Sequence, residues 1–163
     1  MKIFLIRHAE ATDQITEKFI SDDYRYLTLS GRKTAIKTAK NLREELQGIE
    51  KIFTSPLIRA VQTAEIFADS IKEIPEVEVA QEMRNESSAV SFQKLLRENY
   101  SYSSLAFTGH EPKMSYLAKI LTGDKEIKFN FGKAGVCKID YNIISESGKL
   151  KWYYNPSKKE FVK

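Results

Sequence analysis

The sequence predicts an α/β fold in which a mostly parallel sheet is covered by helices on both faces. Short apolar runs of strand length alternate along the chain with segments that carry apolar residues at helical spacing. Near the end, two runs of alternating apolar and polar residues joined by 145–148 predict an antiparallel hairpin. We expect a single domain over residues 1–163, because this length can bury a core without disulfides or a structural metal.

The composition favours a cytoplasmic protein that handles anions. Cys137 is the only cysteine, so no disulfide framework and no thiolate cluster can form within the chain. No apolar stretch approaches the roughly 18 residues that predict a membrane span. The formal charge of +4 and the pI near 9.0 suit phosphorylated partners. This excess is too small to predict nucleic-acid binding, so we expect neither a nucleic-acid nor a membrane partner.

The first predicted strand runs from Lys2 to Ile6 and ends at Arg7-His8. The polar residues 12–26 have no clear period and are expected to form a loop that crosses near the end of this strand. Thr28 is the predicted N-cap of the helix that follows, and Gly48 is placed to end it. The predicted buried face of that helix comprises Ala35, Ala39, Leu42 and Leu46.

The second predicted strand, Lys51–Thr54, leads directly into another helix. Ser55 is the expected N-cap, with Pro56 in the first turn. Arg59 then lies in that first turn, beside the positive end of the helix dipole. The predicted buried stripe comprises Val61, Ala64, Ala68 and Ile71.

A third predicted strand at Glu76–Val79 is followed by a polar connection and by a helix that carries Phe92, Leu95 and Leu96. The strand Ser104–Thr108 repeats the strand, turn and helix pattern through Gly109-His110. Its helix begins near Pro112, buries Met114, Leu117, Ala118 and Leu121, and ends at Gly123. In the predicted hairpin, Cys137, Ile139 and Tyr141 alternate along one strand, and Leu150, Trp152 and Tyr154 alternate along the other.

Arg7, His8, Arg59 and His110 form the candidate site. Each is predicted where a strand ends or a helix begins, which is the edge of an open α/β sheet where ligands bind. Arginine gives paired, charge-assisted hydrogen bonds to phosphate oxygens and keeps its proton. An imidazole held among such cations resists a second proton and keeps a lone pair that can attack phosphorus. The set therefore predicts a site for a tetrahedral dianion.

Four short motifs occur in series along the chain. An Arg-His-Ala triplet occupies 7–9, and Leu-Thr-x-x-Gly occupies 27–31. Ser-Pro-x-x-Arg-x-x-x-Thr-Ala spans 55–64, and a late Gly-His stands at 109–110. In this order, and over nearly the whole chain, the motifs resemble those of the histidine phosphatase superfamily, also called the phosphoglycerate-mutase-like proteins.

The resemblance implies a role for each residue of the candidate site. His8 would be the nucleophile and form a phosphohistidine intermediate, which water then hydrolyses. Arg7, Arg59 and His110 would bind the phosphoryl oxygens. The resemblance implies neither a metal nor another cofactor.

The general acid of the family has no clear counterpart in this sequence. Glu111 follows His110 directly, and Glu82 lies in the polar connection after the third strand, so these two are the favoured candidates. Glu86 and Glu10 are further possibilities, although Glu10 is as well suited to anchor a loop. An imidazole leaving group depends less on a strong acid than an alkoxide does, which links the open assignment to the choice of substrate.

The chain is compact beside mutase-type members of the family and has little room for an inserted cap. Its length and motif order are similar to those of SixA-like phosphohistidine phosphatases, which implies a phosphorylated protein as substrate. The alternatives are a phosphatase of a small phosphomonoester, a phosphoglycerate-type mutase and a non-catalytic phosphate-binding module. The segment Phe129–Gly135 is a candidate for the lining of the entrance.

Overall fold

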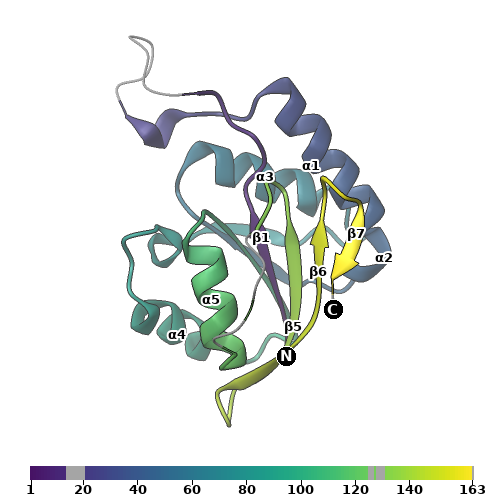
Figure 1. Cartoon of the computed structure of the whole chain (residues 1–163). Helices are drawn as coiled ribbons and strands as arrows, with labels where there is room; N and C mark the ends of the chain where they lie inside the picture. The colour runs from purple at the N-terminus through teal and green to yellow at the C-terminus, as the bar shows by residue number, and fades with distance from the viewer. Residues whose placement is uncertain (14–20, 125–126, 128–130, 163) are drawn as a thin grey trace.

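A seven-stranded mixed sheet forms the centre of the computed structural model, which describes residues 1–13, 21–124, 127 and 131–162 (Figure 1). The strands are arranged in the order β3-β2-β4-β1-β5-β6-β7. Their bounds are β1 Lys2–Arg7, β2 Lys51–Thr54, β3 Glu76–Val79, β4 Ser104–Gly109, β5 Val136–Asn142, β6 Ser147–Asn155 and β7 Glu160–Val162.

The first four strands of this order run parallel, and the last three are antiparallel additions beyond β1. Strands β1 and β4 lie at the middle of the sheet and pair in register from Lys2 with Ser104 to Arg7 with Gly109. All six residues of β4 are buried, as expected for a strand that is covered on both faces. The predicted α/β class, with a mostly parallel sheet and a C-terminal hairpin, is therefore confirmed.

Helices cover both faces of the sheet and divide the core into two layers (Figure 1). Helices α4 (Ala89–Glu98) and α5 (Lys113–Thr122) pack on the face that carries Ile3 and Leu5 of β1. Helices α1 (Leu29–Asn41), α2 (Arg43–Leu46) and α3 (Ile58–Ala68) pack on the opposite face, with Phe4 and Ile6. This alternation along β1 is the period of two that a strand buried on both sides requires.

Several predicted helix ends are confirmed. The Thr28 hydroxyl accepts a hydrogen bond from the Gly31 N–H, as its predicted cap role requires. The Ser88 hydroxyl caps α4 in the same way, although this cap was not predicted. Gly123 ends α5 with a φ of 68°, a conformation that glycine adopts without a side-chain penalty. In α5, Met114, Leu117, Ala118 and Leu121 are buried as expected.

The start of α3 and the length of α1 differ from the prediction. The N-cap of α3 is Leu57, because the Ser55 side chain is turned into the sheet edge. Val61 is partly exposed, and the buried face of α3 instead includes Thr63 and Phe67. The first helix ends at Asn41, and the separate short helix α2 carries Leu46 before Gly48 takes a φ of 79°.

The hairpin is present as predicted, and the predicted alternation holds along β5 but not along β6. The register shifts between Lys138 and Ile139, so that Lys138 pairs with Trp152 and Ile139 with Leu150. This irregularity reverses the alternation along β6. Leu150 packs beside the layer of α4 and α5, whereas Trp152 lies in the other layer. The short strand β7, which pairs with the end of β6, was not predicted.

The loop predicted over residues 12–26 contains a short 3₁₀ turn, η1 (Asp22–Tyr24), capped by the Ser21 hydroxyl. Ala11 and Leu27 form a single antiparallel bridge at its base. Residues 14–20 of this loop lie outside the described part of the chain. Within the described residues, no helix is both long and apolar enough to cross a membrane.

We expect Gly31→Ala to destabilise the protein, although alanine has the higher helix propensity. A Cβ at this position would lie 2.0 Å from the Glu10 carbonyl oxygen, so the helix or the chain after β1 must move. The expected loss is about 1–3 kcal/mol of unfolding free energy, as for other overpacked sites. Urea unfolding measures it, with Ser30→Ala on the exposed side of the same turn as the control. Equal stability of the two variants would mean that this close approach is not a constraint.

Candidate active site

The two histidines meet at the carboxyl edge of the sheet. Each follows the end of a central strand, and the His8 N–H donates to the Gly109 carbonyl at 2.9 Å. This pairing places the imidazole ring centroids of His8 and His110 5.0 Å apart, with 54° between the ring planes. The parallel register therefore brings together two side chains that are separated by about a hundred residues.

Arg59 approaches the same edge from the first turn of α3. Its side chain is buried, with the residue only 6% exposed. It is held by Asp22, whose carbonyl oxygen accepts from Nη1 at 2.8 Å and whose carboxylate accepts from Nη2 at 2.6 Å. The positive charge of Arg59 lowers the pKa of both His8 and His110.

Arg7 ends β1 and also acts on both histidines, since its charge lowers each pKa. One terminal nitrogen of its guanidinium donates to the Phe131 carbonyl oxygen. Its Nε is buried and has no hydrogen-bond partner among the described residues. A buried donor without a partner is destabilising unless a ligand accepts from it.

His8 is held as a neutral imidazole in one tautomer. Its Nδ1 lies 2.6 Å from the Ala9 carbonyl oxygen, and because a carbonyl can only accept, Nδ1 carries the proton. Nε2 therefore keeps its lone pair. Burial lowers the pKa of His8 to about 4. The hydrogen bond to the Ala9 carbonyl raises this pKa, whereas the charges of Arg59, Arg7 and Arg25 lower it further.

His110 is also neutral at physiological pH. Burial lowers its pKa to about 3, with additional lowering by His8, Arg59 and Arg7, while Asp22 opposes the shift. Its Nε2 lies 2.8 Å from the Ser55 hydroxyl, and both groups are buried. Its Nδ1 is buried without a partner among the described residues. Ser55, expected to be a helix cap, therefore contacts the site instead.

Two further contacts fix the backbone around His8. The Ala9 N–H donates to the Thr63 hydroxyl at 3.2 Å, and this hydroxyl donates to the Arg59 carbonyl at 2.7 Å. The Glu10 carboxylate accepts from the Thr28 hydroxyl at 2.7 Å. Glu10 thus ties the chain after β1 to the start of α1, which agrees with the anchoring role considered for it.

The three glutamates considered as the general acid, Glu111, Glu82 and Glu86, lie in different local environments. One carboxylate oxygen of Glu111 accepts from the Ser115 hydroxyl at 2.8 Å and from the Phe131 N–H at 3.0 Å. Glu111 thereby supports Phe131, which in turn holds Arg7. Glu82 belongs to the 3₁₀ turn η2 (Gln81–Met83), and Glu86 is exposed 3.7 Å from Arg84. None of these carboxylates has a described hydrogen bond to either histidine.

Asp22 was missed by the sequence analysis, which treated its segment as a polar loop. Its carboxylate bridges Arg59 and Arg25, and these cations keep the pKa of Asp22 below its usual value despite burial. The neighbouring Asp23 binds Arg84 at 2.9 Å, which joins η1 to the loop after β3. The pair of acidic residues Asp22 and Asp23 in a basic chain was the available signal, but two of their partners, Arg59 and Arg84, are distant in sequence.

The segment suggested as an entrance lining is only partly described. Residues 129 and 130 lie outside the described chain. Phe131 contacts Arg7, and the Gly132 N–H donates to the Tyr153 hydroxyl at 2.7 Å. Among the described residues, no three His, Cys, Asp or Glu side chains are grouped so that they could hold a metal ion.

Comparisons with known proteins agree with this arrangement. Residues 3–111 match the model of the histidine phosphatase superfamily, branch 1. Phosphohistidine phosphatase SixA of Escherichia coli K12 is 26% identical over 100% of this chain and 99% of its own length. A protein of Picosynechococcus sp. is 31% identical over 83% of this chain and 82% of its own length.

The fold of this chain also matches that of a solved structure. The structure of the protein histidine phosphatase SixA complexed with tungstate matches with a TM-score of 0.86 and 25% identity. The match covers 98% of this chain and 100% of that one. The sequence resemblance and the α/β architecture are thereby confirmed, and the chain belongs to the histidine phosphatase superfamily, branch 1, with SixA among its homologues.

Proposed function

We propose that this protein is a metal-independent phosphatase that hydrolyses phosphohistidine in a protein through a phosphohistidine intermediate on His8. The observation that carries the proposal is the neutral His8 imidazole, with its Nε2 lone pair, beside His110 and two arginines. A neutral imidazole is a nucleophile, and fixed cations stabilise the charge that gathers on the phosphoryl oxygens. The similarity to SixA supports the substrate class.

In the proposed reaction, His8 Nε2 attacks phosphorus and the leaving group departs on the opposite side. Arg7, Arg59 and His110 bind the phosphoryl oxygens, for which the buried Arg7 Nε and His110 Nδ1 are available donors. Water then attacks the phosphohistidine in a second in-line step and returns His8 to its starting state. Two inversions give overall retention at phosphorus.

The surroundings of the acidic residues favour a phosphohistidine substrate. No carboxyl group has a described hydrogen bond to either histidine, and the cations around Asp22 keep its carboxylate ionised. An alkoxide leaving group would require a proton from such a residue. A departing imidazole depends less on such a donor, because its second nitrogen takes up a proton from the buffered solvent near neutral pH. We therefore assign Glu111 a positioning role for Phe131 and Arg7.

We expect a synthetic phosphohistidine peptide to be hydrolysed with a higher kcat/KM than an aryl phosphate or any member of a panel of phosphorylated metabolites. Phosphate release in the presence of a chelator measures the rates. His8→Ala should lower turnover of every substrate by at least about a thousandfold, since the nucleophile is lost.

Three outcomes would change the proposal. Undiminished turnover by His8→Ala would remove His8 as the nucleophile. Loss of activity with the chelator would overturn metal independence. A preference of several orders of magnitude for one sugar phosphate would replace the protein substrate by a small phosphomonoester, and transfer of phosphate between two positions of a metabolite would indicate a mutase.

We expect neither imidazole to take up a proton as the pH is lowered from 8 to 5. The pKa of His8 lies at about 4 and that of His110 at about 3, chiefly because both rings are buried. These are the only histidines, so the imidazole NMR signals report directly on the site. Because the unfolded chain takes up these protons near pH 6.5, unfolding free energy should fall as the pH drops from about 6.5 towards 4. A titration midpoint near 6.5 for either ring would contradict the neutral site.

Ser55→Ala should lower kcat/KM by about tenfold through His110. In the proposed site the Ser55 hydroxyl donates to Nε2 and leaves the proton on Nδ1, where it can reach a phosphoryl oxygen. Without the hydroxyl, both tautomers become available. Nitrogen NMR shifts of His110 should then show a mixture of tautomers, which a purely structural effect would not produce. An unchanged tautomer in Ser55→Ala would exclude this positioning role.

A further inference from the structure

Helix α1 carries an exposed row of apolar and basic side chains, which we call the α1 stripe. It consists of Leu29, Lys33, Ile36, Lys37 and Lys40, which recur at spacings of three and four residues along one side of the helix. Leu29 is 80% exposed and Ile36 is 43% exposed. The three lysines are exposed as well. The stripe therefore offers apolar contacts and positive charge to solvent together.

The positive charge of the stripe is not balanced by acidic residues of its own helix. Residues 29–41 include four cations and no aspartate or glutamate. None of the three lysines of the stripe forms an ion pair with a described residue, whereas Lys51 and Lys138 pair with carboxylates at 2.5 and 2.9 Å. A row of unpaired cations on one helix favours an anionic partner.

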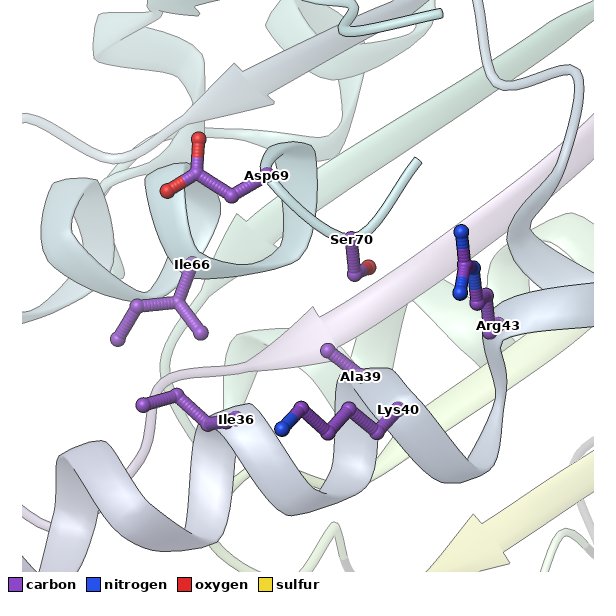
Figure 2. Close-up of a pocket in the computed structure, with 7 residues that line it drawn as sticks. All are labelled: Ile36, Ala39, Lys40, Arg43, Ile66, Asp69 and Ser70. Atoms are coloured by element: carbon purple, nitrogen blue, oxygen red, sulfur yellow. The ribbon is translucent and has the colours of Figure 1, made fainter. Parts of the chain in front are cut away.

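The stripe continues into a groove between α1 and α3 (Figure 2). Ile36 and Ala39 of α1 and Ile66 of α3 supply its apolar surface. The rest of its lining includes two cations, Lys40 and Arg43, and one carboxylate, Asp69. Figure 2 shows Ile36 and Ile66 side by side between the two helices. A groove of this kind accommodates apolar side chains of a partner while its border attracts carboxylates.

The other end of the stripe lies beside the candidate active site. Leu29 follows Thr28, whose hydroxyl donates to the Glu10 carboxylate two residues after His8. At about 1.5 Å per residue, Lys40 lies about 18 Å along the helix from Thr28. A partner segment of about three helical turns would span the stripe while a residue near its end reached His8.

On this basis, and resting on the function proposed above, we propose that the α1 stripe binds an acidic amphipathic helix of the phosphorylated protein substrate. The apolar side of that helix would cover Leu29 and Ile36, and its carboxylates would pair with the lysines. Nucleic acid fits the stripe less well. The stripe has no aromatic side chain on which bases could stack.

The test uses two phosphohistidine peptides, one with glutamate and leucine at helical spacing and one with lysine in place of glutamate. We expect the wild-type protein to hydrolyse the acidic peptide with about tenfold higher kcat/KM at low salt, a difference that should shrink as salt screens the charges. The variant Lys33→Glu, Lys37→Glu, Lys40→Glu should lose this preference through a higher KM. Its hydrolysis of p-nitrophenyl phosphate should stay within about twofold of wild type.

A matched control separates the α1 stripe from net charge. Lys94→Glu, Lys149→Glu, Lys151→Glu also reverses three exposed lysines, and both variants change the formal charge from +4 to −2. Lys94 lies on α4, which covers the opposite face of the sheet. The control variant should keep the preference for the acidic peptide. An equal loss in the two variants would overturn the proposal.

A binding measurement that requires no hydrolysis distinguishes failure of the docking proposal from failure of the proposed function. Fluorescence anisotropy of the labelled, unphosphorylated acidic peptide should show about tenfold weaker binding to the α1 variant than to the control variant. Failure of His8→Ala to reduce hydrolysis would refute the proposed function and leave this measurement unaffected. Equal binding by both variants would refute the docking surface alone. Tighter binding of a single-stranded oligonucleotide than of the peptide, lost in the α1 variant, would assign the stripe to nucleic acid and overturn the proposal.

Discussion

The parallel pairing of β1 with β4 is the constraint on which the rest of the structure depends. Both strands are central and buried on both faces, so their register is fixed by two apolar layers at once. A shift by one residue would exchange the inward sides and separate His8 from His110. The buried middle of the sheet therefore sets the geometry of the candidate site, while the loops supply its contacts.

Burial and positive charge act together at this edge of the sheet. Burial alone disfavours the charged imidazole, and the neighbouring arginines add to the effect, so both rings stay neutral over the physiological range. Without a counter-charge, the side chains of these arginines would repel one another. Asp22 supplies it by bridging Arg59 and Arg25. Its segment thus belongs to the site although it lies in an irregular loop.

Much of the fold was accessible from local sequence patterns. The strands Lys51–Thr54 and Glu76–Val79 were predicted with their observed bounds, because short apolar or alternating runs between turn signals have few other solutions. Thr28 and Gly123 were recognised at helix ends because capping is a local interaction. The alternation along β5 was predicted correctly, but that along β6 was not, since the shift between Lys138 and Ile139 depends on what both layers of the core can accommodate. The faces of β6 follow from packing rather than from alternation.

The sequence by itself determined the α/β class, the order of the motifs and the presence of Arg7, His8, Arg59 and His110 at strand or helix ends. Only the tertiary structure decided how these residues are supported. Ser55 looked like a helix cap, yet its hydroxyl contacts His110, and Asp22 looked like a loop residue, yet it holds Arg59. The physical reason is that capping and periodicity are set by near neighbours. A buried charge or imidazole takes its partner from whichever segment the fold brings to it.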